Sequence, residues 1–136
     1  MFEYFEHTAD AGIRILASDK VELFRDAARA LFRLIVEKPE NVKAVEHRSV
    51  KVAGTDDAYL LIDWLNELLY LHCTQNLVFS EFKIRVTSEG MEADVAGELL
   101  NDDRHCPLHE VKAITCHGLE VKQTGEGWRA TLIVDI

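Results

Sequence analysis

The chain has 136 residues, of which 48% are hydrophobic and 29% are charged, a composition typical of a globular protein with one core. Its formal net charge is −9. Proteins that bind nucleic acids tightly cluster Lys and Arg residues, which displace counterions from phosphates, so this composition disfavours direct binding to RNA or DNA. It favours basic proteins and divalent cations as partners. We expect a single domain spanning residues 1–136.

Neither a membrane span nor a signal peptide is indicated by the sequence. No apolar run approaches the roughly 20 residues that cross a bilayer, and the first residues lack the basic start and long apolar stretch of a signal peptide. The three cysteines, Cys73, Cys106 and Cys116, argue against a disulfide framework because their number is odd. We therefore expect a cytoplasmic protein with reduced thiols, and the sequence does not indicate its oligomeric state.

The first half of the chain alternates strand and helix patterns. A strand over residues 3–7, a polar break over 8–12 and a strand over 13–16 suggest a hairpin. Asp19 and Glu22 have the spacing of a capping box and predict a helix from there to about Glu37. A strand pattern over 42–53 is followed by a helix pattern over 57–74, which is apolar nearly all round and is therefore expected to be buried on several sides.

The second half reads mainly as strands. Residues 82–87 and 91–95 alternate around a turn and predict a hairpin, and a polar loop follows at 101–104. Strands are expected at 111–116, 119–122 and 128–136. The whole pattern predicts an α+β fold: a two-layer sandwich with two main helices packed on a mixed or antiparallel sheet, and an additional β-hairpin.

Two acidic residues occupy unusual places in this pattern. Alternation in the last strand sends every second side chain toward one face, namely Trp128, Ala130, Leu132, Val134 and Ile136. Asp135 points toward the other face. Asp135 then stands beside the terminal carboxyl group, and two adjacent carboxylates repel each other unless a cation or hydrogen-bond donors compensate them. Asp10 lies in the expected loop between two strands, a common place for functional residues. A solvated chain end and ordinary turn chemistry are the simpler explanations.

Four motifs, in order along the chain, resemble the archease family. They are His7-Thr8-Ala9-Asp10, the run from Trp64 to Leu71, the run from Glu110 to Val121, and Val134-Asp135-Ile136. The sequence departs from the family pattern around Cys106-Pro107-Leu108-His109, at Asn101 and at Cys116.

The resemblance implies a function and a site. Archeases are accessory proteins of the GTP-dependent RNA ligase that joins tRNA halves, and they promote its guanylylation and multiple turnover without being ligases themselves. RNA would then be met only through the ligase. The resemblance assigns Asp10, Asp135 and Ile136 to a divalent-metal site, and oxygen ligands of this kind suit Ca²⁺ first, with Mg²⁺ or Mn²⁺ as alternatives. Such an ion could act near the ligase nucleotide or only pin two chain ends together.

Other polar residues allow further interpretations. The resemblance makes His7, Glu110, Lys112 and His117 candidates for partner contact, whereas Glu110 and Lys112 alone could form a surface ion pair. Cys and His residues at 106, 109, 116 and 117 could in principle bind zinc or form a nucleophilic pair, but their spacing fits no standard site. Asp63 and Glu67, one helical turn apart, are expected on a solvated stripe.

Three functions compete at this stage. The first is an activator of the tRNA-splicing ligase. The second is a chaperone or specificity modulator of another RNA-modifying enzyme, such as a tRNA methyltransferase. The third, a metal-dependent hydrolase, requires a base, a nucleophile and a cavity, and the sequence shows no such constellation.

Overall fold

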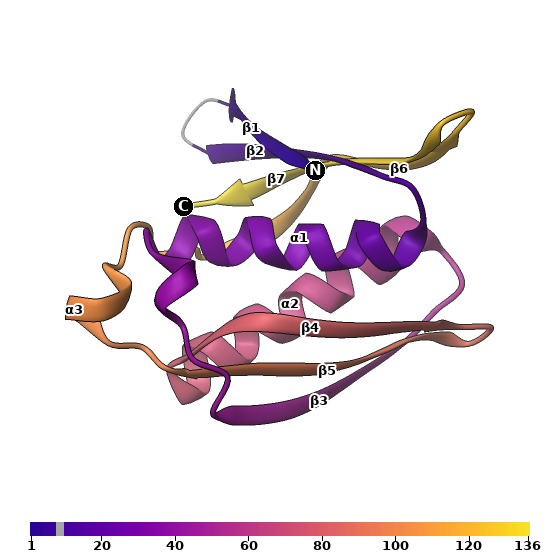
Figure 1. Cartoon of the computed structure of the whole chain (residues 1–136). Coiled ribbons are helices and arrows are strands. Elements are labelled where there is room, and N and C mark those ends of the chain that lie inside the picture. The colour runs from indigo at the N-terminus through magenta and orange to yellow at the C-terminus, as the bar shows by residue number, and fades with distance from the viewer. Residues whose placement is uncertain (8–9) are drawn as a thin grey trace.

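The computed structural model describes residues 1–7 and 10–136, with the side chain of His7 outside the description. Two long helices lie between two antiparallel sheets (Figure 1). The first sheet has the order β1-β2-β7-β6, and its strands are Phe2–His7, Asp10–Ala17, Gly127–Asp135 and Ala113–Thr124. The second has the order β3-β5-β4, with strands Glu46–Ala53, Gly90–Leu99 and Leu77–Thr87. The helices are α1 (Lys20–Ile35), α2 (Asp57–Gln75), the short α3 (Asp102–His105) and the 3-10 turn η1 (Pro39–Asn41).

The N-terminus of α1 is fixed by a side-chain cap. Asp19 accepts a hydrogen bond from the backbone N–H of Glu22 at 2.8 Å, which satisfies one of the free donors of the first turn. The apolar side of α1 then packs against β4 of the second sheet and β2 of the first. The helix therefore joins the two sheets into one hydrophobic core.

Helix α2 is buried on several sides, as its sequence predicts. Asp56 caps its start by accepting from the backbone N–H groups of Ala58 and Tyr59, at 3.0 and 3.1 Å. The indole of Trp64, which is fully buried, donates to the backbone carbonyl of Phe24 at 2.9 Å and so links α2 to α1. Asn76 ends the helix in the left-handed conformation that is common at helix C-termini, with φ of 56°.

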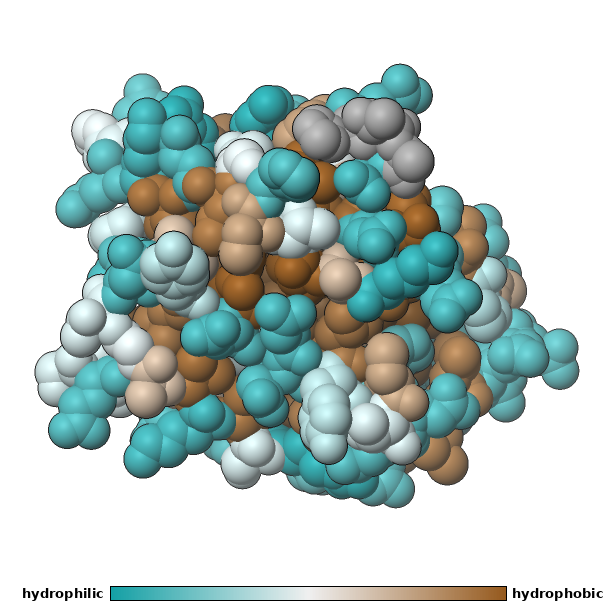
Figure 2. All heavy atoms as spheres, turned by 180° about the vertical axis from the view of Figure 1, so that it is seen from behind, coloured by the Kyte–Doolittle hydropathy of each residue, from teal (hydrophilic) through white to brown (hydrophobic). Residues whose placement is uncertain are grey.

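The outer side of α2 belongs to the rear face of the molecule. Tyr59 and Tyr70 are 63% and 62% exposed, and Asp63 and Glu67 between them are also exposed, as expected for a solvated stripe. Seen from behind, the molecule shows several hydrophobic patches separated by hydrophilic side chains (Figure 2). Because α2 contains no Lys or Arg, it offers no basic stripe for phosphate groups.

The α+β class, the two main helices and the antiparallel pairing are confirmed. The expected additional hairpin, β4 and β5, pairs with β3 to form a sheet of its own, so the helices lie between two sheets and the architecture has three layers instead of two. Alternation shows which side of a strand is buried but not which strands pair, and this explains the difference. No helix in residues 1–7 and 10–136 is both long and apolar enough to cross a bilayer.

Several element boundaries differ from the prediction, and three of these differences concern segments near the site. Strand β2 begins at Asp10 instead of residue 13, so Asp10 belongs to a strand and not to a loop. The two strands expected on either side of residues 117–118 form the single strand β6, whose register against β7 shifts between Thr115 and Glu120. The polar loop expected at 101–104 contains α3, capped by Asn101, which accepts from the backbone N–H of Arg104 at 2.9 Å.

Candidate functional site

Asp10 and Asp135 meet at one end of the first sheet. Strands β2 and β7 are antiparallel, with Ala11 opposite Val134, and continuing this register by one residue places Asp10 opposite Asp135. Asp135 in turn lies opposite Ala113 of β6. The two acidic residues that the sequence singled out are therefore cross-strand neighbours, and we call them the carboxylate pair.

Both members of the carboxylate pair belong to the outer face of the sheet. In β7, Ala130, Leu132 and Val134 are fully buried against the helices, and alternation assigns Asp135 to the opposite face, as predicted. In β2, Ile13 and Ile15 are likewise fully buried, so Asp10 belongs to the outer face with Gly12 and Arg14. Asp10 and Asp135 are both half-buried.

An aromatic ring covers the sheet one step inward from this pair. Gly12 lies opposite Phe5 in β1, and a Cβ atom at Gly12 would lie only 2.3 Å from the Phe5 ring. The guanidinium of Arg14 lies over the Phe5 ring, 5.0 Å from its centroid. Glycine at position 12 therefore lets Phe5 lie flat on the outer face, beside the carboxylate pair.

The segment before β6 reaches the carboxylate pair through its backbone. Leu108 and His109 donate their N–H groups to the carbonyl oxygens of Ile35 and Leu34, at 2.9 and 3.1 Å, which satisfies acceptors at the C-terminal end of α1. Lys112 then donates its N–H to the carbonyl oxygen of Asp135 at 2.8 Å. The divergent run around Cys106 to His109 thus has a structural role, because it ties the end of α1 to the end of β7.

The other predicted site residues lie at several places around the carboxylate pair and along β6. Ile136 is half-buried and packs against the core next to Asp135. His7 pairs with Asp10 in the backbone register, and Thr8 and Ala9 of the same motif lie outside the described residues. Glu110 and Lys112 precede β6, which begins at Ala113 and not at residue 111 as predicted. His117 lies in β6, at the point where the register against β7 shifts. All three residues are exposed.

The donor set of the carboxylate pair suits a hard cation. Two neighbouring carboxylates supply oxygen ligands, which Ca²⁺, Mg²⁺ and Mn²⁺ prefer. Within residues 1–7 and 10–136, no three His, Cys, Asp or Glu side chains are grouped so that they could hold a metal ion. Any ion at this end of the sheet would therefore need a main-chain or terminal oxygen, or water, to complete its coordination.

A buried polar network that the sequence did not reveal holds the nearby loop. Glu98, only 8% exposed, accepts from the backbone N–H of Lys43 at 2.6 Å, from both terminal nitrogens of Arg104 and from Nε2 of His105 at 3.1 Å. The fully buried His105 accepts at Nδ1 from the backbone N–H of Asn101 at 2.9 Å. The Arg104 guanidinium, together with the Lys43 and His105 donors, outweighs desolvation and lowers the pKa of Glu98 to about 2. The network anchors the segment that leads from α3 toward Lys112.

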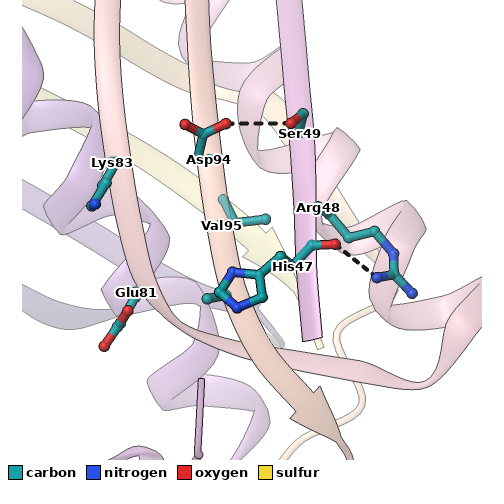
Figure 3. Close-up of a pocket in the computed structure, with 8 residues that line it drawn as sticks. His47, Arg48, Ser49, Glu81, Lys83, Asp94 and Val95 are labelled. Carbon is teal, nitrogen blue, oxygen red and sulfur yellow. Dashed lines mark hydrogen bonds between the residues drawn. The ribbon is translucent and has the colours of Figure 1, made fainter. Parts of the chain in front are cut away.

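A separate hollow lies on the outer face of the second sheet (Figure 3). Its floor includes Ala96, whose neighbours across the sheet are His47 of β3 and Glu81 of β4. Asp94 accepts from the Ser49 hydroxyl at 3.3 Å and from Arg85 at 3.1 Å, and these contacts, Arg85 foremost, lower the pKa of Asp94. The charged residues that line this hollow are of both signs, so it has no clear preference for one class of ligand.

Comparison with known proteins identifies the family. Residues 2–136 match the model of the archease protein family. The chain belongs to the archease family. The archease of Pyrococcus abyssi is 40% identical over 140 residues, covering 99% of this chain and 98% of that protein, and the archease of Methanosarcina mazei is 36% identical over 140 residues, covering 99% and 95%. The resemblance seen in the four motifs is therefore confirmed.

Solved archease-like structures share the fold. The solution structure of protein 1598 of Methanobacterium thermoautotrophicum superposes with a TM-score of 0.79 at 34% identity, covering 99% of this chain and 98% of that one. The crystal structure of a Thermotoga maritima archease, described as a possible chaperone, gives a TM-score of 0.69 at 17% identity, with 97% and 94% coverage. The second match, at this low identity, supports the fold alone.

Proposed function

We propose that this archease family member is a non-catalytic accessory protein that activates the GTP-dependent tRNA-splicing RNA ligase in the cytoplasm. Its role would be to promote guanylylation of the ligase and so allow multiple turnover. Membership of the family over residues 2–136 supports the role. The observation that carries the proposal is the cross-strand pairing of Asp10 with Asp135, because it brings two motifs from opposite ends of the chain to one place.

In this proposal the carboxylate pair and Ile136 form a divalent-metal site. Asp10 and Asp135 would supply side-chain oxygens and Ile136 a terminal oxygen, with Ca²⁺ as the first candidate and Mg²⁺ or Mn²⁺ as alternatives. A bound cation would neutralise the repulsion between the two carboxylates and, with so few protein ligands, keep positions open to water or a phosphate. The half-buried positions of both aspartates favour this role, because partial burial strengthens their attraction for a cation.

The surface chemistry supports a protein partner in place of RNA. The net charge of −9 disfavours direct contact with phosphates and favours a basic enzyme surface. Candidate contacts are His7, Glu110, Lys112 and His117, since the last three are exposed and Lys112 bonds directly to Asp135 through the backbone. RNA would be reached only through the ligase.

A second candidate function is that of a chaperone. The Thermotoga maritima archease with the same fold is described as a possible chaperone. This chain would then assist another RNA-modifying enzyme, such as a tRNA methyltransferase, and the carboxylate pair would serve only to fix the chain ends.

A ligase–GMP assay separates these functions. Purified ligase, GTP and a divalent cation are mixed with wild-type protein, the Asp10→Asn variant or the Glu126→Gln control, which removes one charge in the turn at the far end of β6 and β7. We expect the wild type and Glu126→Gln to accelerate formation of ligase–GMP, and folded Asp10→Asn to lose most of this effect. Full acceleration by Asp10→Asn would contradict an active metal site, and no acceleration by the wild type would favour the chaperone function.

A further inference from the structure

One segment of the chain runs beside the end of α1 and reaches the carboxylate pair. It comprises residues 101–112, and we call it the strap. Figure 1 shows α3, which belongs to the strap, at the same end of the molecule as the C-terminus. The N–H groups of Glu37 and Lys38 donate to the carbonyl oxygens of Cys106 and His105, at 2.9 and 3.1 Å. Together with the two bonds that the strap donates to the last carbonyl groups of α1, these contacts pair the middle of the strap with the segment around the end of this helix.

The first part of the strap is anchored on the second sheet. Glu98, buried near the end of β5, accepts from both terminal nitrogens of Arg104 and from Nε2 of His105. The His105 ring is itself fully buried and accepts at Nδ1 from the backbone N–H of Asn101. We call Glu98, Arg104 and His105 the Glu98 network. Because one charged acceptor holds two side chains of α3 at once, the network fixes α3 in a single position on the sheet.

The last part of the strap fixes the end of β7. Val111 is buried in the core, and the next residue, Lys112, donates its N–H to the carbonyl oxygen of Asp135 at 2.8 Å. Asp135 is the last residue of β7, and strand ends open most readily. The position of the Asp135 carboxylate relative to Asp10 therefore depends on where the strap holds Lys112.

We propose that the Glu98 network positions the carboxylate pair for cation binding. The network anchors the strap, the strap holds Lys112, and Lys112 holds the main chain of Asp135 where its carboxylate can share a cation with Asp10. Groups outside a ligand set that orient the ligands commonly raise the metal affinity of a site. The inference rests on the proposed metal site, and it adds that residues outside the ligand set control how tightly the cation is bound.

Two variants loosen the anchored end of the strap, and a third is their control. Glu98→Gln removes the charge at the centre of the Glu98 network. Asn101→Ala removes the side-chain cap of α3 at an exposed position and is the milder change. Trp64→Phe is the matched control, because it lowers stability through the loss of a bond to Phe24, near the start of α1, whereas the strap lies beside the end of this helix.

Two measurements on the full-length proteins test the proposal. Hydrogen exchange in EDTA, followed by NMR, gives the protection of the Lys112 amide without any cation, and calorimetric titration gives the affinity for Ca²⁺. We expect Glu98→Gln and Asn101→Ala each to lower both quantities by at least about fivefold. Trp64→Phe should keep the Ca²⁺ affinity of the wild type to within about twofold although it is less stable.

The results that contradict the proposal differ from those that contradict the metal site. Unchanged protection of Lys112 in Glu98→Gln and Asn101→Ala would overturn the proposal, because the Glu98 network would then not hold the strap. An equal loss of Ca²⁺ affinity in Trp64→Phe would also overturn it, because the effect would then follow global stability. Unchanged affinity of the two strap variants, beside a wild type that binds Ca²⁺, would refute the positioning role alone. Absence of Ca²⁺ binding to the wild type would refute the metal site itself and the inference with it.

Discussion

Lys112 donates its backbone N–H to the carbonyl oxygen of Asp135 across 2.8 Å. This bond continues the pairing of β6 with β7 one residue beyond the start of β6 and holds the last strand in place at its end. The frayed chain end that the sequence left open as an alternative therefore does not describe this arrangement. Ile136 is half-buried against the core as well.

Hydrogen exchange should detect this fixed chain end. The Lys112 amide should exchange more slowly than that of Glu110, which makes no hydrogen bond among the described residues, because exchange of a bonded amide requires local opening. The two amides can be compared by NMR at one pH, after correction for their intrinsic rates. Equal protection of both would show that the end of β7 frays.

Extension of the chain beyond Ile136 tests the contribution of a terminal oxygen. One added glycine moves the terminal carboxylate away from Asp135 while leaving β7 intact, so we expect weaker Ca²⁺ binding without a change in thermal stability in EDTA. An N-terminal tag is not a neutral comparison, because the Met1 ammonium lies 2.5 Å from the carboxylate of Asp26. An insertion in the Ser88–Gly90 turn of the second sheet is a better control, and equal Ca²⁺ affinity of all three proteins would exclude the terminal carboxylate as a ligand.

Glu98 should contribute to the free energy of unfolding, although no motif in the sequence marks it. Replacing it with Gln removes the charge that Arg104 and His105 bond, and we expect a loss of about 2 kcal/mol in the free energy of unfolding at pH 7, measured with urea. The exposed Glu89→Gln, in the turn between β4 and β5, should change it by less than about 0.5 kcal/mol. A loss of the same small size in both variants would show that the network contributes little.

The pH dependence of this contribution follows from the lowered pKa. The pKa of Glu98 is about 2 in the folded protein against an ordinary 4.5, so between these values the unfolded chain binds the proton more readily. The stabilisation by Glu98 is therefore complete above about pH 4.5 and is lost as the pH falls toward 2. The difference between wild type and Glu98→Gln should shrink over that interval.

Trp64 should be important for the contact between the two helices. In Trp64→Phe the carbonyl of Phe24 loses the indole donor and the smaller ring leaves a void in the core, which together we expect to cost about 2 kcal/mol. Urea unfolding followed by circular dichroism measures the loss, with Trp128→Phe, a half-buried position on the first sheet, as the control. Equal stability of Trp64→Phe and wild type would contradict the role of this hydrogen bond.

The features that the sequence predicts well are local. Asp19 starts α1 through a side-chain cap, and the face of Asp135 follows from alternation alone. The start of β2 at Asp10 was missed because Ala11-Gly12 resembles a turn; glycine fits a strand here only because Phe5 from the neighbouring strand covers it. This contact depends on tertiary structure and has no signature in the sequence.

The parts that sequence reasoning missed depend on which segments pair. The second sheet, the single strand β6 and the network around Glu98 all join residues distant in the chain. Similarly, Asp10 and Asp135 were assigned to one site through the family resemblance, whereas the register of β2 against β7 supplies the physical reason for their proximity. The cavity between α1, η1 and β4 combines residues distant in the chain and could not be anticipated from any one of these elements.

Calorimetric titration with Ca²⁺ tests the carboxylate pair most directly. Wild-type protein, Asp10→Asn, Asp135→Asn and the control Glu126→Gln are titrated at the same pH and ionic strength, with folding of each checked beforehand. We predict that wild type and Glu126→Gln bind one ion per chain and that each aspartate variant loses at least about tenfold in affinity. Absence of binding to the wild type, or unchanged affinity in either aspartate variant, would contradict a metal site at the meeting point of β2 and β7.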